Sequence, residues 1–195
     1  MKVIFLDIDG VMNSTLLAHK RYKRRWLRPI TYKWWIQGKI RFIKNGFKNK
    51  PISLGNWHPP RNFYEFSYRF KRLKEATDST AWKFLINLID ETGAKICISS
   101  VWKHHFNNID EWNRAFELLG FRDDICVGIT GARRTLRGSE IKEWLDLHPL
   151  YTTYAIIDDD SDMLPEQMPY FFLSDGYCGL SPNICYRIKR LFNNS

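Results

Sequence analysis

Short apolar runs alternate with longer amphipathic segments along most of the chain. The run from Val3 to Leu6 is β-branched or aromatic and too short for a helix, so it predicts a buried strand. The same pattern predicts further strands over residues 94–99, 125–127, 154–157 and 170–173, and helices over 80–90, 110–119, 139–147 and 182–192. Strands that alternate with helices pair in parallel and have both faces covered. The pattern therefore predicts an α/β fold with a Rossmann-like parallel sheet.

Residues typical of helix ends flank three of these helices. Asp78 or Ser79 is a candidate N-cap for the helix over 80–90, and Gly93 is a candidate stop. Gly120 closes the next helix, and Pro149 ends the one after it. These signals support the helix boundaries independently of the hydrophobic spacing.

Residues 14–75 do not continue this alternation. They contain four prolines, several glycines and 13 aromatic residues. We therefore expect a core domain made of residues 1–13 and 76–195, with a cap inserted after the first strand at residues 14–75. A cap at that place would hang over the carboxyl edge of the sheet like a lid.

The positive charge of the chain is concentrated in the predicted cap. The whole chain has 30 Lys and Arg against 21 Asp and Glu, a net charge of +9. The cap has 17 Lys and Arg against two acidic residues, whereas the rest of the chain has 13 against 19. Such a basic segment repels itself unless an anionic partner neutralises it. A nucleic acid, a nucleotide, an acidic membrane surface or the chain's own acidic domain could do so, and the clustering favours nucleic acid.

Two interpretations of the cap stay open. Basic residues interleaved with aromatic rings can form a groove that follows a nucleic-acid backbone while the rings stack on bases. Alternatively, the aromatic residues form the core of a small cap, and the basic residues form its solvated face. The candidates for nucleic-acid contact are Arg24, Arg25, Lys33, Trp34, Arg69, Lys71 and Arg72.

Length and composition narrow the class of protein further. A chain of 195 residues suits one domain with a sizeable core. No apolar run approaches the roughly 20 residues of a membrane helix, and the N-terminus does not resemble a signal peptide. The four cysteines lack zinc-like spacing, and Cys97 and Cys126 lie in apolar runs typical of buried free thiols. We therefore expect a cytoplasmic protein without a membrane span.

Two aspartates directly follow the first predicted strand. In open α/β sheets, ligands bind beyond the carboxyl ends of the strands, where Asp7 and Asp9 stand. Gly10 lets the backbone turn sharply after them. Two carboxylates at such a turn can divide the chemistry, one attacking or binding a metal and the other moving a proton. For this motif alone, a calcium or magnesium loop and a simple polar turn are the alternatives.

Polar residues also follow two other predicted strands. Ser99 and Ser100 end the strand over 94–99, where a hydroxyl can bind a phosphate oxygen, although serine is also common in turns and helix caps. Residues 158–160 and 162 are all aspartate and follow the strand over 154–157. Carboxylates so close together repel one another, a cost that a hard cation such as Mg²⁺ can offset. A solvated acidic turn is the alternative.

A cation is expected between the serines and the acidic cluster. Arg137 precedes the helix predicted to begin near Ser139, where it could neutralise both a phosphate and a nucleophilic carboxylate. Arg134 and Lys142 are the rival positions.

The order of these motifs, an aspartate pair, a hydroxyl, a cation and an acidic cluster, resembles that of the haloacid dehalogenase (HAD) superfamily of phosphotransferases. The segments that carry the resemblance are residues 5–13, 98–103, 137–145, 157–162 and 179–181. They are most similar to the HAD branch of RNA-repair proteins and to the phosphatase half of polynucleotide kinase-phosphatase. The resemblance covers about residues 1–13 and 76–185 and leaves out the cap.

The resemblance implies a mechanism and a metal. Asp7 would attack the phosphorus and form an aspartyl-phosphate. Asp9 would protonate the leaving oxygen and then activate water. Mg²⁺ would be bound by Asp7, by the backbone carbonyl of Asp9, and by Asp158 with Asp159.

The resemblance also implies a phosphate site and a reaction class. Ser99, Ser100 and Arg137, with Arg134 as the alternative cation, would hold the phosphoryl oxygens. The protein would then be a HAD-type phosphatase, a Mg²⁺-dependent phosphomonoesterase acting on nucleic-acid ends or nucleotides. Two alternatives stay open, a nucleic-acid-binding protein on a HAD scaffold with weak or no catalysis, and a small-molecule phosphatase. The end preference, the choice between RNA and DNA, and the oligomeric state stay open as well.

Overall fold

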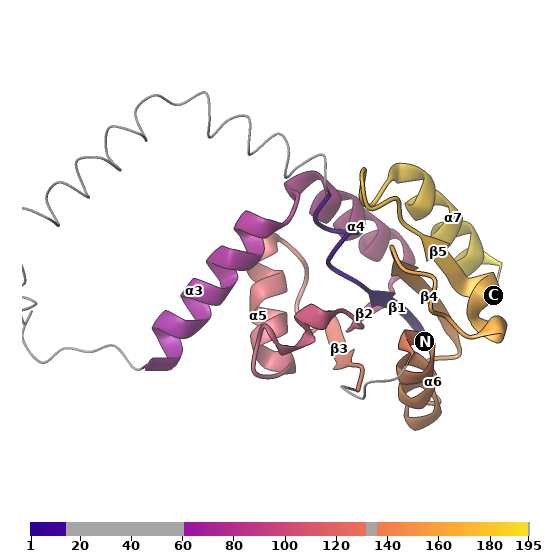
Figure 1. Ribbon diagram of the computed structural model, residues 1–195, viewed down its shortest axis with the longest axis horizontal. Helices are drawn as coiled ribbons and strands as arrows, with labels where there is room; N and C mark the ends of the chain where they lie inside the picture. The colour runs from indigo at the N-terminus through magenta and orange to yellow at the C-terminus, as the bar shows by residue number, and fades with distance from the viewer. Residues whose placement is uncertain (15–60, 132–135, 195) are drawn as a thin grey trace, which may run out of the picture.

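A five-stranded parallel sheet forms the centre of the structure, a computed structural model that describes residues 1–14, 61–131 and 136–194 (Figure 1). The strand order is β3-β2-β1-β4-β5, and every neighbouring pair is parallel. The strands are β1 (Lys2–Leu6), β2 (Lys95–Ile98), β3 (Cys126–Ile129), β4 (Thr153–Asp158) and β5 (Phe171–Leu173). The predicted Rossmann-like parallel sheet is confirmed.

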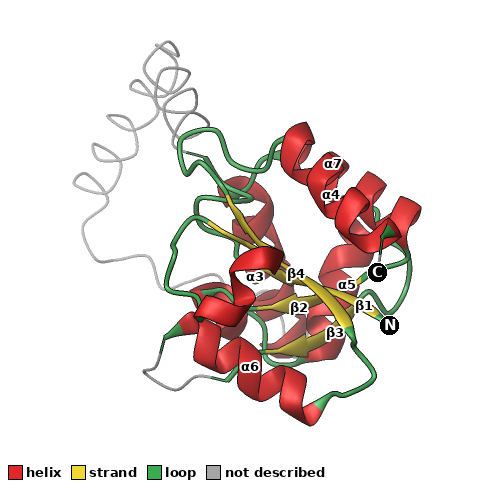
Figure 2. Cartoon of the chain, turned by 90° about the vertical axis from the view of Figure 1, so that its right-hand side faces the viewer, coloured by secondary structure: helices red, strands yellow, loops and turns green. Residues whose placement is uncertain are grey.

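Helices cover both faces of this sheet. They are α3 (Arg61–Ala76), α4 (Ser79–Thr92), α5 (Ile109–Leu119), α6 (Arg137–Leu147) and α7 (Pro182–Asn193), with 3₁₀ segments η1 (Val101–His104) and η2 (Pro165–Tyr170). Figures 1 and 2 show α4 and α7 on one side of the sheet and α6 on the other. Alternation along β1 explains the two layers: Ile4 and Leu6 belong to the larger apolar cluster, with side chains of α4, α5 and α7, whereas Val3 and Phe5 pack in the smaller one with α6.

The predicted helix ends are confirmed at several positions. Asp78 is the N-cap of α4, and its Oδ1 accepts a hydrogen bond of 2.8 Å from the backbone N–H of Thr80. Gly93 ends α4 with φ +69°, and Gly120 ends α5 with φ +102°. Both φ angles lie in the left-handed region, where glycine is favoured because it has no Cβ.

Other boundaries differ from the prediction. Helix α6 begins at Arg137, ahead of the predicted start near Ser139, because the backbone N–H of Arg137 donates to Asp162 Oδ2 at 3.0 Å. A carboxylate at this amide satisfies one of the free donors of the helix N-terminus. The segments η1 and η2 were not predicted, since runs this short show no clear hydrophobic period.

Helix α3 lies at the end of the segment predicted to be a cap. Phe66 and Leu73 of α3 are 4% and 0% exposed, and both belong to the larger apolar cluster. This part of the segment therefore packs on the same core as β1. The division of the chain into a core and a cap stays a prediction, because residues 15–60 lie outside the described residues.

The strand register brings the polar strand ends to one edge of the sheet. The backbone N–H of Asp7 donates to Ile157 O at 3.0 Å, and the N–H of Ser99 donates to Leu6 O at 3.1 Å. The carboxyl ends of β1, β2 and β4 are therefore level. Since these strands are neighbours, Asp7, Ser99 and Asp158 meet at the same rim.

Two further predictions concern the cysteines and membrane-spanning helices. Cys97 and Cys126 are buried free thiols, as predicted. Among the residues that the structure describes, no helix combines the length and apolar character needed to cross a bilayer.

Candidate active site

Asp7 lies at the centre of the rim. Its side chain is 3% exposed, and the residue follows the last position of β1. Ser100, which is fully buried, hydrogen-bonds the Asp7 carboxylate. A buried carboxylate with few donors is poorly solvated, so burial raises the pKa of Asp7, although Arg137 and Ser100 oppose the rise.

Arg137 joins the ends of three strands. Its Nη1 lies 2.9 Å from Asp7 Oδ1, and its Nε lies 3.2 Å from Asp158 Oδ2. The same Nη1 donates to the carbonyl oxygen of Ser99. Burial alone would lower the pKa of Arg137, but Asp158 and Asp7 together raise it, so the guanidinium stays charged. The start of α6 thus places one cation between two buried carboxylates.

Three carboxylates converge beside this guanidinium. Oxygens of Asp7, Asp158 and Asp159 lie within 4.8 Å of one another. Asp158 is fully buried, and its Oδ1 accepts a hydrogen bond of 3.0 Å from the N–H of Asp160. Its Oδ2 accepts no aligned hydrogen bond from the described residues. Burial, with repulsion from Asp7, raises the pKa of Asp158 to about 7.

This donor set fits a hard divalent cation. Mg²⁺ prefers carboxylate oxygens, and Asp158 offers a buried one that the described part of the protein leaves without a hydrogen bond. Gly10 faces the cluster with φ +67°, and a Cβ at that position would stand 2.0 Å from Asp159 Oδ2. The backbone turn after β1 therefore leaves room for the Asp159 carboxylate.

The carboxylate of Asp9 has different neighbours. Its Oδ1 accepts a hydrogen bond of 2.7 Å from Asn13 Nδ2, and its Oδ2 accepts one of 3.0 Å from Trp102 Nε1. Asn13 Oδ1 in turn accepts the backbone N–H of Gly10 at 2.8 Å. The Asp9 side chain is exposed and is not part of the group of three carboxylates. Asp7 and Asp9 are thus in distinct surroundings, one buried among charges and the other at the surface.

The two predicted serines also differ. Ser100 is the N-cap of η1 and contacts Asp7, as described above. Ser99 is 2% exposed, and its Oγ makes no hydrogen bond with the described residues. Ser99 lines a cavity of about 150 Å³ together with Arg137 and Lys103. A buried hydroxyl without a hydrogen bond, on a residue whose carbonyl accepts from a guanidinium, is suited to an anionic oxygen.

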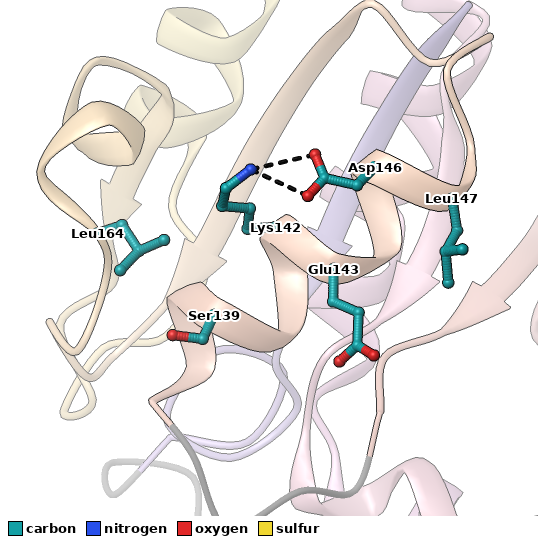
Figure 3. Close-up of a pocket in the computed structure, with 6 residues that line it drawn as sticks. All are labelled: Ser139, Lys142, Glu143, Asp146, Leu147 and Leu164. Carbon is teal, nitrogen blue, oxygen red and sulfur yellow. Dashed lines mark hydrogen bonds and ion pairs between the residues drawn. The ribbon is translucent and has the colours of Figure 1, made fainter.

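The rival cations are placed elsewhere or lie outside the described residues. Lys142 points to Asp146 on the same helix, with Nζ 2.9 Å from Asp146 Oδ2, and the pair lines an open pocket on the outside of α6 (Figure 3). None of the carboxylates at the rim lines that pocket. Arg134 lies outside the described residues. Of the two candidate cations among the described residues, Arg137 lies beside Asp7 and Lys142 does not.

Three of the seven candidates for nucleic-acid contact are among the described residues. Arg24, Arg25, Lys33 and Trp34 lie outside the described residues. Three others lie on α3. Arg69 pairs with Glu65 and donates to Asn107 Oδ1 at 2.8 Å. Lys71 and Arg72 are exposed.

Sequence reasoning missed a buried ion pair beside the site. Lys103 Nζ lies 2.7 Å from Glu140 Oε2, and the two side chains are 9% and 8% exposed. Thr130 Oγ1 also donates to Glu140 Oε2, at 3.3 Å. Because residues three apart share one helix face, the spacing of Arg137 and Glu140 could have indicated that Glu140 faces the same region as Arg137. Trp102 and Lys103 lie in one of the segments that carry the family resemblance, residues 98–103, but the resemblance gave neither a role, and η1 is too short to show a hydrophobic period.

Comparison with known proteins supplies the family. A family model described as the HAD domain in Swiss Army Knife RNA repair proteins matches residues 3–184. No curated protein and no solved structure showed a significant match to the chain. The matched range includes the five strands of the sheet, except for Lys2 at the start of β1, and every residue of the candidate site. The chain therefore belongs to the HAD domains of Swiss Army Knife RNA repair proteins.

Proposed function

We propose that the protein is a Mg²⁺-dependent phosphomonoesterase that transfers a phosphoryl group to Asp7 and then to water, with nucleic-acid ends or nucleotides as its substrates. One observation carries this proposal. Arg137 lies between Asp7 and Asp158, so that a nucleophilic carboxylate, a fixed cation and a cluster of oxygen ligands meet at one rim. The family, whose members are HAD domains, supports phosphatase-like chemistry.

The first chemical step forms a bond between Asp7 and phosphorus. A carboxylate oxygen of Asp7 attacks the phosphorus, and the bond from phosphorus to the leaving alcohol breaks. Asp9 gives its proton to the leaving oxygen, so the alcohol departs neutral. Arg137 and the free hydroxyl of Ser99 stand where they can bind the phosphoryl oxygens.

The second step returns the protein to its starting state. Asp9, now ionised, accepts a proton from a water molecule, whose oxygen attacks the phosphorus. The bond between phosphorus and Asp7 breaks, and inorganic phosphate leaves. Both steps place extra negative charge close to Asp7 and Asp158, where Arg137 compensates part of it.

Asp7, Asp158 and Asp159 would hold the Mg²⁺. A bound Mg²⁺ supplies positive charge that stabilises the transferring phosphoryl group. It would also favour the ionised form of Asp7, whose pKa burial raises.

Two features support a nucleic-acid substrate. The family is that of RNA repair proteins. Residues 14–75 carry 17 Lys and Arg against two acidic residues, and such clustering attracts a phosphate backbone. In the sequence, the segment begins at residue 14, seven positions after Asp7.

The proposal is tested by phosphate release. We expect the wild type to release phosphate in the presence of Mg²⁺ and to lose this activity with a chelator. Asp7→Asn should lower the rate by a factor on the order of 10⁴ or more, since it removes the attacking group. Asp146→Asn, an exposed carboxylate paired with Lys142 outside the site, is the matched control and should keep the wild-type rate. A Mg²⁺-dependent rate that survives in Asp7→Asn would contradict the proposal.

The choice of substrate needs a comparison of phosphate esters. A 3′-phosphorylated and a 5′-phosphorylated oligonucleotide, a mononucleotide and a small sugar phosphate should be assayed at equal concentration. We expect a higher kcat/KM for an oligonucleotide and inhibition by unphosphorylated RNA that weakens with salt. Indifference to RNA would favour the small-molecule phosphatase. Salt-sensitive RNA binding without turnover of any ester would favour the binding protein.

A further inference from the structure

The Asp9 side chain is held from two different parts of the fold. Asn13 belongs to the same turn as Asp9, and the backbone N–H groups of Met12 and Asn13 both donate to Ile8 O within that turn. Trp102 belongs to η1, 93 residues further along the chain, and donates to Asp9 Oδ2 at 3.0 Å. Asn13 therefore moves with the turn, whereas Trp102 ties the carboxylate to the end of β2.

The indole of Trp102 is itself fixed in place. The backbone N–H of Trp102 donates to Ser100 Oγ at 3.3 Å, and its carbonyl oxygen accepts the N–H of His105 at 2.7 Å. The His105 ring lies 4.7 Å from the indole ring, and His105 Nε2 lies 2.8 Å from the carbonyl oxygen of Arg69 on α3. The indole also packs against the larger apolar cluster. Contacts from η1, α3 and the core thus determine where the indole N–H points.

Two donors on opposite oxygens fix the plane of a carboxylate. Each carboxylate oxygen has two lone pairs. A hydrogen bond to one lone pair leaves the second lone pair of that oxygen free to carry or accept a proton. With Asn13 alone, the group could rotate about the bond between Cβ and Cγ. Proton transfer depends on such orientation, because donor and acceptor must lie within hydrogen-bond reach.

We propose that Trp102 is a positioning residue for Asp9 and holds its carboxylate in the orientation that protonates the leaving oxygen. This inference rests on the proposed phosphatase function. The proposal gives a role to a residue of η1, whereas the motifs at the strand ends assign roles only to the aspartates, the serines and Arg137. Trp102 itself touches no reacting atom in this scheme and acts through Asp9.

The test uses two aryl phosphates that differ in their need for a proton. The 4-nitrophenolate group leaves readily without one, whereas the phenolate of phenyl phosphate leaves poorly. Trp102→Phe keeps an aromatic ring and removes the indole N–H. We expect kcat/KM for phenyl phosphate to fall about tenfold, a part of the roughly 10²–10⁴-fold that a general acid contributes. For 4-nitrophenyl phosphate, kcat/KM should stay within about twofold of the wild type.

The choice of kcat/KM and of these esters removes two complications. The value of kcat/KM reports steps up to phosphoryl transfer to Asp7, so slow hydrolysis of the phosphoenzyme does not enter it. Neither ester carries a nucleobase, so loss of base stacking on the indole cannot produce the difference. Both kcat/KM values are measured on one preparation. An unfolded, inactive fraction therefore lowers both by the same factor and leaves their ratio unchanged.

Two further variants complete the design. Trp112→Phe removes a buried indole whose Nε1 has no hydrogen-bond partner among the described residues, and it should leave the ratio at the wild-type value. Asp9→Asn removes the acid itself, and adding Trp102→Phe to it should cause no further change in the ratio.

The outcomes separate the two proposals. A wild type that hydrolyses neither ester with Mg²⁺ would overturn the phosphatase function. A wild type that hydrolyses both, with Trp102→Phe reducing the two kcat/KM values equally or not at all, would overturn the positioning role alone. A selective loss with phenyl phosphate, absent in Trp112→Phe, would support it.

Discussion

A single glycine allows the acidic cluster to form. Gly10 has φ +67°, and its missing Cβ leaves the space that Asp159 Oδ2 occupies. Gly10→Ala should lower the free energy of unfolding by about 1–3 kcal/mol, because alanine is strained at this φ. It should also weaken Mg²⁺ stimulation, because the added methyl displaces the Asp159 carboxylate. Urea denaturation and a Mg²⁺ titration of phosphatase activity measure the two effects.

Gly93 provides the matched control for this substitution. It has φ +69°, nearly the angle of Gly10, but nothing lies within 4 Å of a Cβ built there. Gly93→Ala should therefore show the conformational strain alone and keep the Mg²⁺ dependence of the wild type. Equal Mg²⁺ titrations for Gly10→Ala and the wild type would mean that Asp159 contributes nothing to cation binding.

At the scale of elements, α6 contributes two charged groups to the same region. Arg137 reaches the rim, and Glu140, one turn later, pairs with Lys103 of η1 at 2.7 Å. Because both partners are buried, removing one leaves an uncompensated charge. Lys103→Met and Glu140→Gln should each lower the free energy of unfolding by about 3–5 kcal/mol. The double variant should lose clearly less than the two single losses combined, as urea denaturation would show.

An exposed pair on the same helix calibrates this measurement. Lys142 and Asp146 have side chains 53% and 63% exposed, so Lys142→Met should cost at most about 1 kcal/mol. If the losses of the Lys103 and Glu140 variants simply add, the pair is not coupled in the way that its distance indicates.

At the scale of the whole molecule, the site connects stability to pH and to Mg²⁺. The pKa of Asp158 is about 7 in the folded protein against an ordinary value of 3.8, chiefly because of burial. Between these values the folded protein keeps a proton that the unfolded chain has lost. Without a divalent cation, this group therefore lowers stability progressively as the pH rises from about 4 to about 7. The pKa of Asp7 is shifted in the same direction.

Mg²⁺ should reverse this loss because it replaces the proton. We expect the increase in Tm on adding Mg²⁺ to be small near pH 5 and larger near pH 8, since the cation competes with protons for the same oxygens. Thermal unfolding of the wild type and of Asp158→Asn, with Mg²⁺ and with a chelator, measures this. A Mg²⁺ effect on Tm that is independent of pH, or that persists in Asp158→Asn, would count against Asp158 as a ligand.

Much of the fold and part of the candidate site could be predicted because their signals are local. The apolar run ending at Leu6 identifies a strand, Gly93 identifies a helix end, and in a parallel sheet the carboxyl ends of neighbouring strands lie at one edge. That geometry predicts that Asp7 and Asp158 lie at the same edge, and the pairing of β1 with β4, which the structure shows, makes them neighbours. The start of α6 was placed too late, because the donor that extends it pairs with Asp162, 25 residues away.

Local signals were enough to predict the α/β class, the strand ends and the run of aspartates over residues 158–162, because hydrophobic period and turn residues act over a few positions. Long-range contacts place Arg137 beside Asp7 and supply one of the donors that hold Asp9. Arg137 and Asp7 are 130 residues apart, and Trp102 and Asp9 are 93 residues apart. Contacts over such separations depend on how helices and 3₁₀ segments pack on the sheet, and no local pattern in the chain encodes the direction in which those side chains point.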